Sequence, residues 1–90
     1  MPEVSRFFGI VISMYWESRA KHHRPHFHAK YQEHEAVFSF DPVELIAGSL
    51  PSKQRHIVEG WAEIHTDELK KNWDLLMADT NPNKIDPLRK

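Results

Sequence analysis

The alternation of apolar and polar side chains begins near the start of the chain and predicts a strand there. Between residues 5 and 16 every second side chain is large and apolar, which is the period of a strand with one buried face. These positions are Phe8, Ile10, Ile12, Met14 and Trp16. The positions between them are mixed, so we expect the opposite face to be partly wet. The pattern predicts one continuous strand over residues 5–16.

Two further strands, over residues 26–31 and 35–41, are predicted on either side of Gln32-Glu33. If that dipeptide is a two-residue turn, counting back from it places Lys30 opposite Glu35. The inner face then carries Phe27, Ala29, Tyr31, His34, Ala36, Phe38 and Phe40. The outer face carries His26, His28, Val37 and Ser39. A four-residue loop is the alternative, and it leaves the same side chains on each face.

A short fourth strand over residues 45–47 is expected to precede a helix that begins near Ser52. Pro51 and Ser52 are typical of a helix start, and apolar residues follow at helical spacing to about residue 78. They are Ile57, Trp61, Ile64, Leu69, Trp73, Leu76 and Met77. The step from Ile64 to Leu69 is one residue too wide for a continuous stripe. We favour one long helix over residues 52–78, and the alternative is a second helix capped by Thr66.

These elements predict an α+β domain with an extended C-terminal tail. Asn81-Pro82-Asn83 ends the helix, and residues 81–90 form the tail. The expected fold is a three- to four-stranded antiparallel meander with one long helix, or two shorter ones, packed on its apolar face. Trp16, Trp61 and Trp73 are expected in the core between the two layers.

Composition narrows the class of protein. Ninety residues make a single domain, and the absence of cysteine excludes a disulfide framework and any cysteine-bearing zinc site. We see neither a signal peptide nor a membrane span, and we expect a cytoplasmic protein with no membrane partner. A net charge of −1 argues against a general nucleic-acid coat protein.

Candidate chemistry gathers in the middle of the chain, where five of the seven histidines lie between residues 22 and 34. No acidic residue occurs from residue 18 to residue 32, so the segment is locally basic. Its cations, the candidate phosphate ligands, are Arg19, Lys21, Arg24 and Lys30. Strand alternation is expected to point His26 and His28 away from the core, beside this basic loop.

Three kinds of site remain open for these side chains. We expect no cofactor, although His26, His28 and His22 are the candidate ligands if a zinc-like divalent ion binds. Histidines with a pKa near about 6.5 also suit acid–base cleavage of a phosphodiester, with His26 and His28 as the pair and Tyr15 assisting. The third alternative is simple binding of nucleic-acid phosphates or of an acidic protein surface.

Several segments together resemble a bacterial family catalogued as domain of unknown function 4160. They are Ser5-Arg6-Phe7-Phe8-Gly9-Ile10, Pro25-His26-Phe27-His28-Ala29, Glu35-Ala36-Val37, Gly48-Ser49-Leu50-Pro51, Trp61-Ala62-Glu63 with His65, Glu68-Leu69, Asn72-Trp73 and Lys84-Ile85-Asp86-Pro87-Leu88. The resemblance implies a compact bacterial protein encoded beside a member of a second small family of unknown function (number 2442). Such gene pairs look like toxin–antitoxin modules. This chain departs from the family in the connection before Pro25, which is longer and more basic.

The expected function is therefore a small binding or regulatory module of a toxin–antitoxin-like gene pair. Its basic loop and outer sheet face would engage a cognate protein from the neighbouring gene, or nucleic acid. The alternative is a histidine-centred ribonuclease or metal-dependent hydrolase. A homodimer is a further open alternative, because a chain of this size buries a small core.

Overall fold

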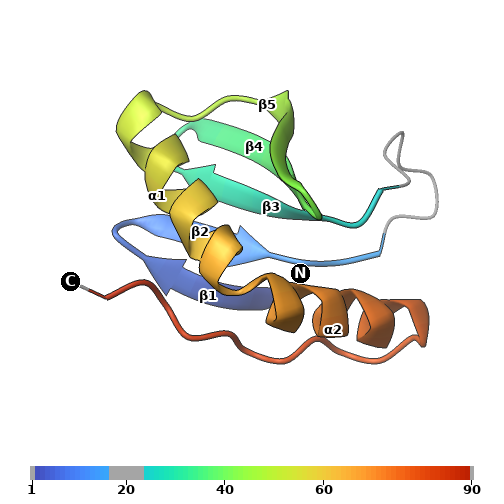
Figure 1. Ribbon diagram of the computed structural model, residues 1–90. Coiled ribbons are helices and arrows are strands. Elements are labelled where there is room, and N and C mark those ends of the chain that lie inside the picture. Colours follow the sequence, from blue (N-terminus) through green and yellow to red (C-terminus); the bar gives the residue numbers. More distant parts are fainter. Residues whose placement is uncertain (1, 17–23, 90) are drawn as a thin grey trace.

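The computed structural model describes residues 2–16 and 24–89, and it has an antiparallel sheet with two helices packed on one face (Figure 1). The strands, in chain order, are β1 (Glu3–Phe7), β2 (Ile10–Ser13), β3 (His26–Tyr31), β4 (His34–Phe40) and β5 (Val43–Gly48). Each strand pairs with the next in the order β1-β2-β3-β4-β5. The helices are α1 (Ser52–Ile64) and α2 (Thr66–Met77). The predicted α+β meander is confirmed, with five strands in place of three or four.

The predicted strand over residues 5–16 is a hairpin, and the prediction of one continuous strand is wrong. Phe8 and Gly9 form its turn with φ angles of 50° and 77°, and two successive positive φ angles are typical of the tight turns that join antiparallel strands. The reversal buries Phe7 and leaves Phe8 42% exposed. Trp16, which follows the hairpin, is 49% exposed. The expectation that Trp16 lies in the core is therefore wrong.

The register between β3 and β4 is the one that counting from Gln32-Glu33 predicts. Lys30 faces Glu35, and the same register continues without a bulge to the pair of His26 and Ser39. Phe27, Ala29, Ala36, Phe38 and Phe40 are all buried on the inner face. The two-residue turn is therefore confirmed. His34, which was expected on the inner face, is exposed.

The helical region is broken at His65, so the prediction of one long helix is wrong and the two-helix alternative is correct. His65 has φ −110° and ψ 25° between α1 and α2. The hydroxyl of Thr66 does not cap α2 but donates to the carbonyl of Ala62 in α1, at 2.9 Å. Such back-bonding from a threonine bends a helix. Neither helix has both the length and the apolar character needed to cross a bilayer.

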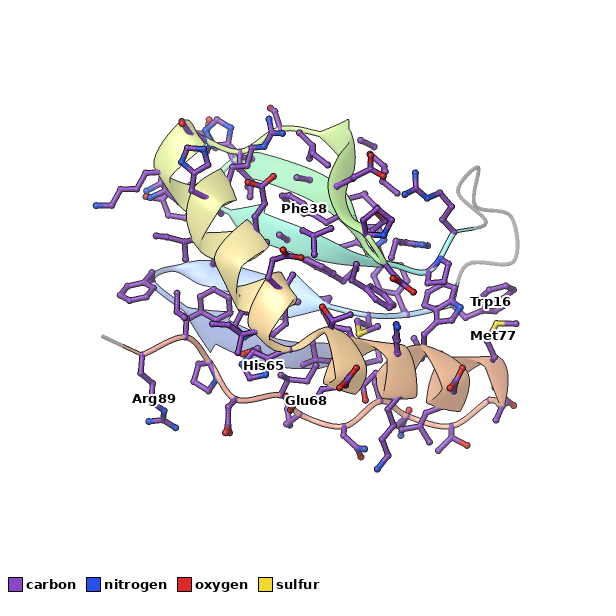
Figure 2. All side chains as sticks on the ribbon, viewed as in Figure 1. Trp16, Phe38, His65, Glu68, Met77 and Arg89 are labelled. Carbon is purple, nitrogen blue, oxygen red and sulfur yellow. The ribbon has the colours of Figure 1, made fainter. Side chains whose placement is uncertain are left out.

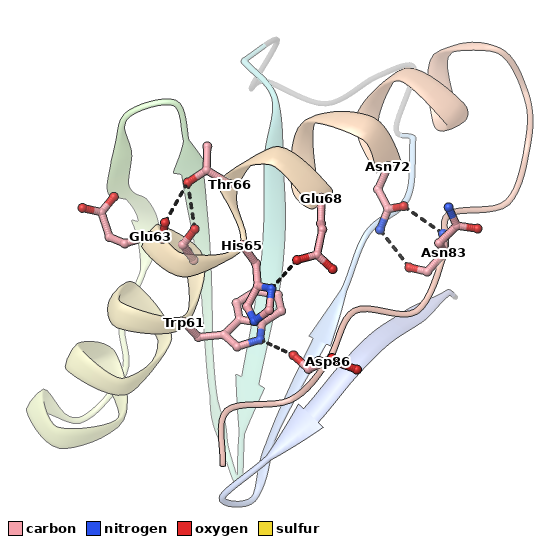
Figure 3. Close-up of polar contacts among 9 residues, drawn as sticks. Trp61, Glu63, His65, Thr66, Glu68, Asn72, Asn83 and Asp86 are labelled. Atoms are coloured by element: carbon pink, nitrogen blue, oxygen red, sulfur yellow. Dashed lines mark hydrogen bonds and ion pairs between the residues drawn. The ribbon is translucent and has the colours of Figure 1, made fainter. Parts of the chain in front are cut away.

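The core lies between the inner face of the sheet and the helices, and the C-terminal tail closes one side of it. Trp61 of α1 is fully buried. The centroid of its ring lies 5.3 Å from the ring centroid of Phe7 and 5.8 Å from that of Phe27. The tail runs extended beside β1 and α2 (Figure 1). Asn72 holds it through two hydrogen bonds of 2.8 Å to the backbone of Asn83 (Figure 3). The extended tail is thus part of the folded unit.

Candidate functional site

The outer face of the sheet, opposite the helices, carries a hollow of about 360 Å³. We call it the outer hollow, and its lining residues are Glu3, Val11, Ser13, Tyr15, His28, Lys30 and Glu35. Strand register explains why they meet. Ser13 of β2 pairs with Glu3 on one side and with His28 on the other, so three strands contribute one row of side chains. The hollow therefore depends on the β1–β2 hairpin.

Tyr15 and His28, two candidate catalytic residues, lie together in the outer hollow. Their rings stack with centroids 4.5 Å apart and planes 15° apart. His28 Nδ1 lies 3.6 Å from a carboxylate oxygen of Glu35, and the histidine side chain is only 13% exposed. The stacked rings form a flat, half-buried wall beside a carboxylate.

His26, the other histidine of the proposed pair, is buried with 2% exposure. Its ring centroid lies 5.2 Å from that of Trp73 in α2 and 5.4 Å from that of His28. His26 Nδ1 donates to the carbonyl of Arg24 at 2.8 Å, and since a carbonyl only accepts, this nitrogen carries the proton. The expectation that His26 points into solvent is wrong, because Trp73 reaches the start of β3 and covers the ring.

The candidate phosphate ligands are not gathered into one cluster among the described residues. Arg24 donates to Glu44 at 2.7 Å and to the hydroxyl of Ser39 at 3.1 Å. Lys30 lines the outer hollow opposite Glu35. Arg19, Lys21 and the candidate metal ligand His22 lie outside the described residues.

Charges on the outer face occur in neighbouring pairs of opposite sign. The described pairs are Arg6 with Glu3, Arg24 with Glu44, and Lys30 with Glu35 across the strands. The hydrogen bond from Arg6 holds the pKa of Glu3 below its ordinary value, so this carboxylate is ionised at neutral pH. Sequence reasoning missed Glu3 because only the hairpin brings it to this face. The signal for that hairpin is Gly9.

A metal site is not formed by the described part of the chain alone. Within residues 2–16 and 24–89, no three histidine, aspartate or glutamate side chains lie close enough together to hold an ion. A site of His26, His28 and His22 thus remains a prediction, since His22 is outside those ranges. His26 is buried, and although the His28 side chain is 13% exposed, both of its ring nitrogens are shielded from solvent.

Comparisons with curated proteins and with solved structures found no significant match. A family model described as "Domain of unknown function (DUF4160)" matches residues 9–74, which is well over half of the 90-residue chain. The match spans β2 to β5, α1 and most of α2, and it contains the outer hollow apart from Glu3. The chain therefore belongs to the DUF4160 family.

Proposed function

We propose that this protein is a small binding module whose outer sheet face docks a partner protein. The partner is the product of the neighbouring gene, in a pair that resembles a toxin–antitoxin module. The observation that supports the proposal most directly is the outer hollow. It combines an aromatic wall, an aliphatic side chain and charges of both signs on the face of the sheet that α1 and α2 leave open.

This mixture is typical of a protein interface. Aromatic side chains are enriched in the centres of such interfaces, where they contribute large contact areas, and charged groups surround them. Tyr15 and His28 supply the aromatic wall, and Val11 adds an aliphatic surface beside it. Lys30 and Glu35 then offer one donor and one acceptor group to a complementary partner.

The charge pairs favour a protein over nucleic acid as the partner. Phosphate backbones are bound by several cations whose charge is free to replace counterions. On the described outer face each cation lies beside a carboxylate, as Arg24 lies beside Glu44. A surface with alternating charge is better matched by a protein surface with the opposite alternation.

A histidine-centred ribonuclease or hydrolase receives less support from this geometry. A general acid–base pair needs both imidazoles within reach of the substrate. His28 borders the outer hollow, but His26 is packed against Trp73 and bonded to the backbone. Both ring nitrogens of His28 are also shielded from solvent, so neither imidazole presents a nitrogen to a substrate in the outer hollow.

Reversing the charge of Lys30, with the substitution Lys30→Glu, is expected to weaken binding of the neighbouring gene's product by about 10-fold or more. The change places a second negative charge opposite Glu35 and removes the donor at the centre of the interface. Isothermal titration calorimetry with the two purified proteins measures the effect. Lys53→Glu on the exposed first turn of α1 is the matched control and should keep wild-type affinity.

Equal affinity of Lys30→Glu and wild type would contradict docking on this face. A fluorescent single-stranded RNA, titrated at several salt concentrations, tests the nucleic-acid alternative. Tight binding that weakens steeply with salt would overturn the choice of a protein partner. RNA cleavage abolished by His28→Ala would instead favour the enzyme.

A further inference from the structure

The wall of the outer hollow brings an exposed carboxylate next to a pair of stacked rings. Glu35 supplies the carboxylate, and its side chain is 58% exposed. One of its oxygens lies 3.6 Å from His28 Nδ1, and the His28 ring stacks on Tyr15. Phe38, three residues later in β4, is buried on the helix side (Figure 2), so alternation along the strand directs Glu35 to the open face. A group that enters the outer hollow therefore meets a carboxylate and aromatic rings together.

The carboxylate of Glu35 has acceptor capacity to offer. It makes no hydrogen bond within the described part of the chain, and its one ion-pair contact there is the one to His28. Glu3 adds a second carboxylate on the β1 side of the outer hollow, and Lys30 is the one ammonium in the lining. Two carboxylates against one ammonium favour a positively charged occupant.

Glu3 is held in place by contacts on several sides. Its backbone pairs with Ser13 of β2 and accepts a hydrogen bond from Lys84 of the tail at 2.6 Å. Arg6, which is not part of the lining, donates two hydrogen bonds of 2.8 and 3.2 Å to the Glu3 carboxylate. A carboxylate accepts about four hydrogen bonds, so this one keeps acceptor capacity. The second carboxylate of the outer hollow is thus fixed before a partner arrives, which reduces the cost of binding.

We propose that the outer hollow binds an arginine side chain of the partner protein, with its guanidinium bonded to Glu35 and packed against the rings of Tyr15 and His28. The inference rests on the function proposed above and names the residue type that the partner contributes. A guanidinium is a planar cation that forms paired hydrogen bonds with a carboxylate and packs on aromatic rings. A cation within about 6 Å of a tyrosine ring is also attracted to the face of that ring. Arginine therefore matches both parts of the wall.

The other occupants match the wall less well. A lysine ammonium is compact and strongly hydrated, so it gains less from an aromatic surface. An uncharged aromatic side chain would stack on Tyr15, but it would remove water from Glu35 and give its carboxylate no donor. A phosphate or carboxylate would be attracted by Lys30 but repelled by Glu35 and Glu3. Charge and shape therefore favour arginine, and Lys30 then pairs with an acidic neighbour of that arginine.

The compound N-acetyl-arginine amide tests the site without the partner, and its neutral isostere N-acetyl-citrulline amide is the matched control. Backbone amide resonances of the isotope-labelled chain are recorded with each compound up to about 50 mM. We expect saturable shifts at Ser13, His28 and Glu35 with the arginine compound alone. Glu35→Gln should weaken this binding about 10-fold, because it removes the charge of the acceptor. Glu33→Gln makes the same change at the exposed turn before β4 and should leave the binding unchanged.

The same variants are then titrated with the purified product of the neighbouring gene. Glu35→Gln should lower its affinity by about 10-fold or more, while Glu33→Gln should not. Tyr15→Leu keeps an apolar side chain but removes the ring, and it should lower the affinity by about 3- to 5-fold. Circular dichroism of each variant shows whether its fold is retained.

Each remaining outcome assigns the failure to one part of the proposals. If Lys30→Glu weakens the partner and Glu35→Gln does not, the partner docks on the outer face without an arginine there. If N-acetyl-lysine amide binds as tightly as the arginine compound, the site does not select a guanidinium. The absence of saturable shifts with the arginine compound at about 50 mM also overturns the inference. If that compound binds as expected but the partner does not bind the wild type, the guanidinium site stands and the proposed function alone fails.

Discussion

Replacing Gly48 with alanine is expected to lower the free energy of unfolding by about 3–5 kcal/mol. Gly48 ends β5 with a φ of 73°, which side chains disfavour, and a Cβ at this position would lie 2.1 Å from the carbonyl oxygen of Glu35. That oxygen belongs to the backbone and also accepts from the amide of Ser49 at 3.1 Å. The clash can be relieved only if β4 and β5 separate.

The matched control is Gly60→Ala, because Gly60 lies inside α1 and a Cβ there has nothing within 4 Å. Alanine should raise the free energy of unfolding at that position by about 0.5–1 kcal/mol, since it restricts the unfolded chain. Urea unfolding of both variants, followed by circular dichroism, measures the two effects. Equal stabilities of the two variants would show that β5 does not approach β4 as closely as described.

Replacing Trp61 with alanine is expected to cost about 3–5 kcal/mol, because it empties the centre of the core. Trp61 is fully buried and contacts Phe7 and Phe27 from two different strands. Its indole nitrogen also donates to the carbonyl of Asp86 in the tail at 2.9 Å (Figure 3). If the alanine variant does not fold, Trp61→Phe still tests the contact. It keeps an aromatic ring but leaves this carbonyl without its donor, at a cost of about 1–3 kcal/mol.

Trp16→Phe makes the same chemical change on the surface, where Trp16 is about half exposed, and should alter stability by less than about 0.5 kcal/mol. Urea unfolding gives the free energies of both phenylalanine variants. Limited proteolysis then reports whether the C-terminal tail is open to cleavage. We expect the Trp61→Phe variant to be cut in the tail earlier than the wild type. A stable Trp61→Phe variant with a resistant tail would contradict the role given to the indole nitrogen.

The part of the fold that could be predicted from the sequence is the part with strict alternation. Phe27, Ala29, Ala36 and Phe38 must all reach the core, and a shift of one residue would expose them. Only one register of β3 and β4 therefore satisfies the pattern, and the structure has it. The inner face was predictable because burial of apolar side chains is a strong and local constraint.

The hairpin and the helix break were harder to predict because each depends on a single local feature. Phe8 adopts a positive φ, which is uncommon for an aromatic residue, so the alternation seemed to pass straight through the turn. Gly9 was the available signal. At the helix break Thr66 bonds back to Ala62, and the spacing of apolar residues reports this only as a step that is slightly too wide.

The candidate site was predicted in part. Alternation correctly placed His28 on the outer face, and it placed His26 on the same side of β3. The alternation gave no information about the burial of His26, because the side chain that covers it, Trp73, comes from a helix almost 50 residues later in the chain. The direction of α2 over the sheet follows from packing and not from the periodicity of β3.

The proposal that a protein docks on the open sheet face is tested most directly by nuclear magnetic resonance. Backbone amide resonances of the isotope-labelled chain are recorded while the unlabelled product of the neighbouring gene is added. The account predicts that the largest shifts occur around the outer hollow, at Val11, Ser13, His28 and Lys30, while the exposed start of α1 is unaffected. Shifts confined to α1, or no shifts at saturating partner, would contradict it.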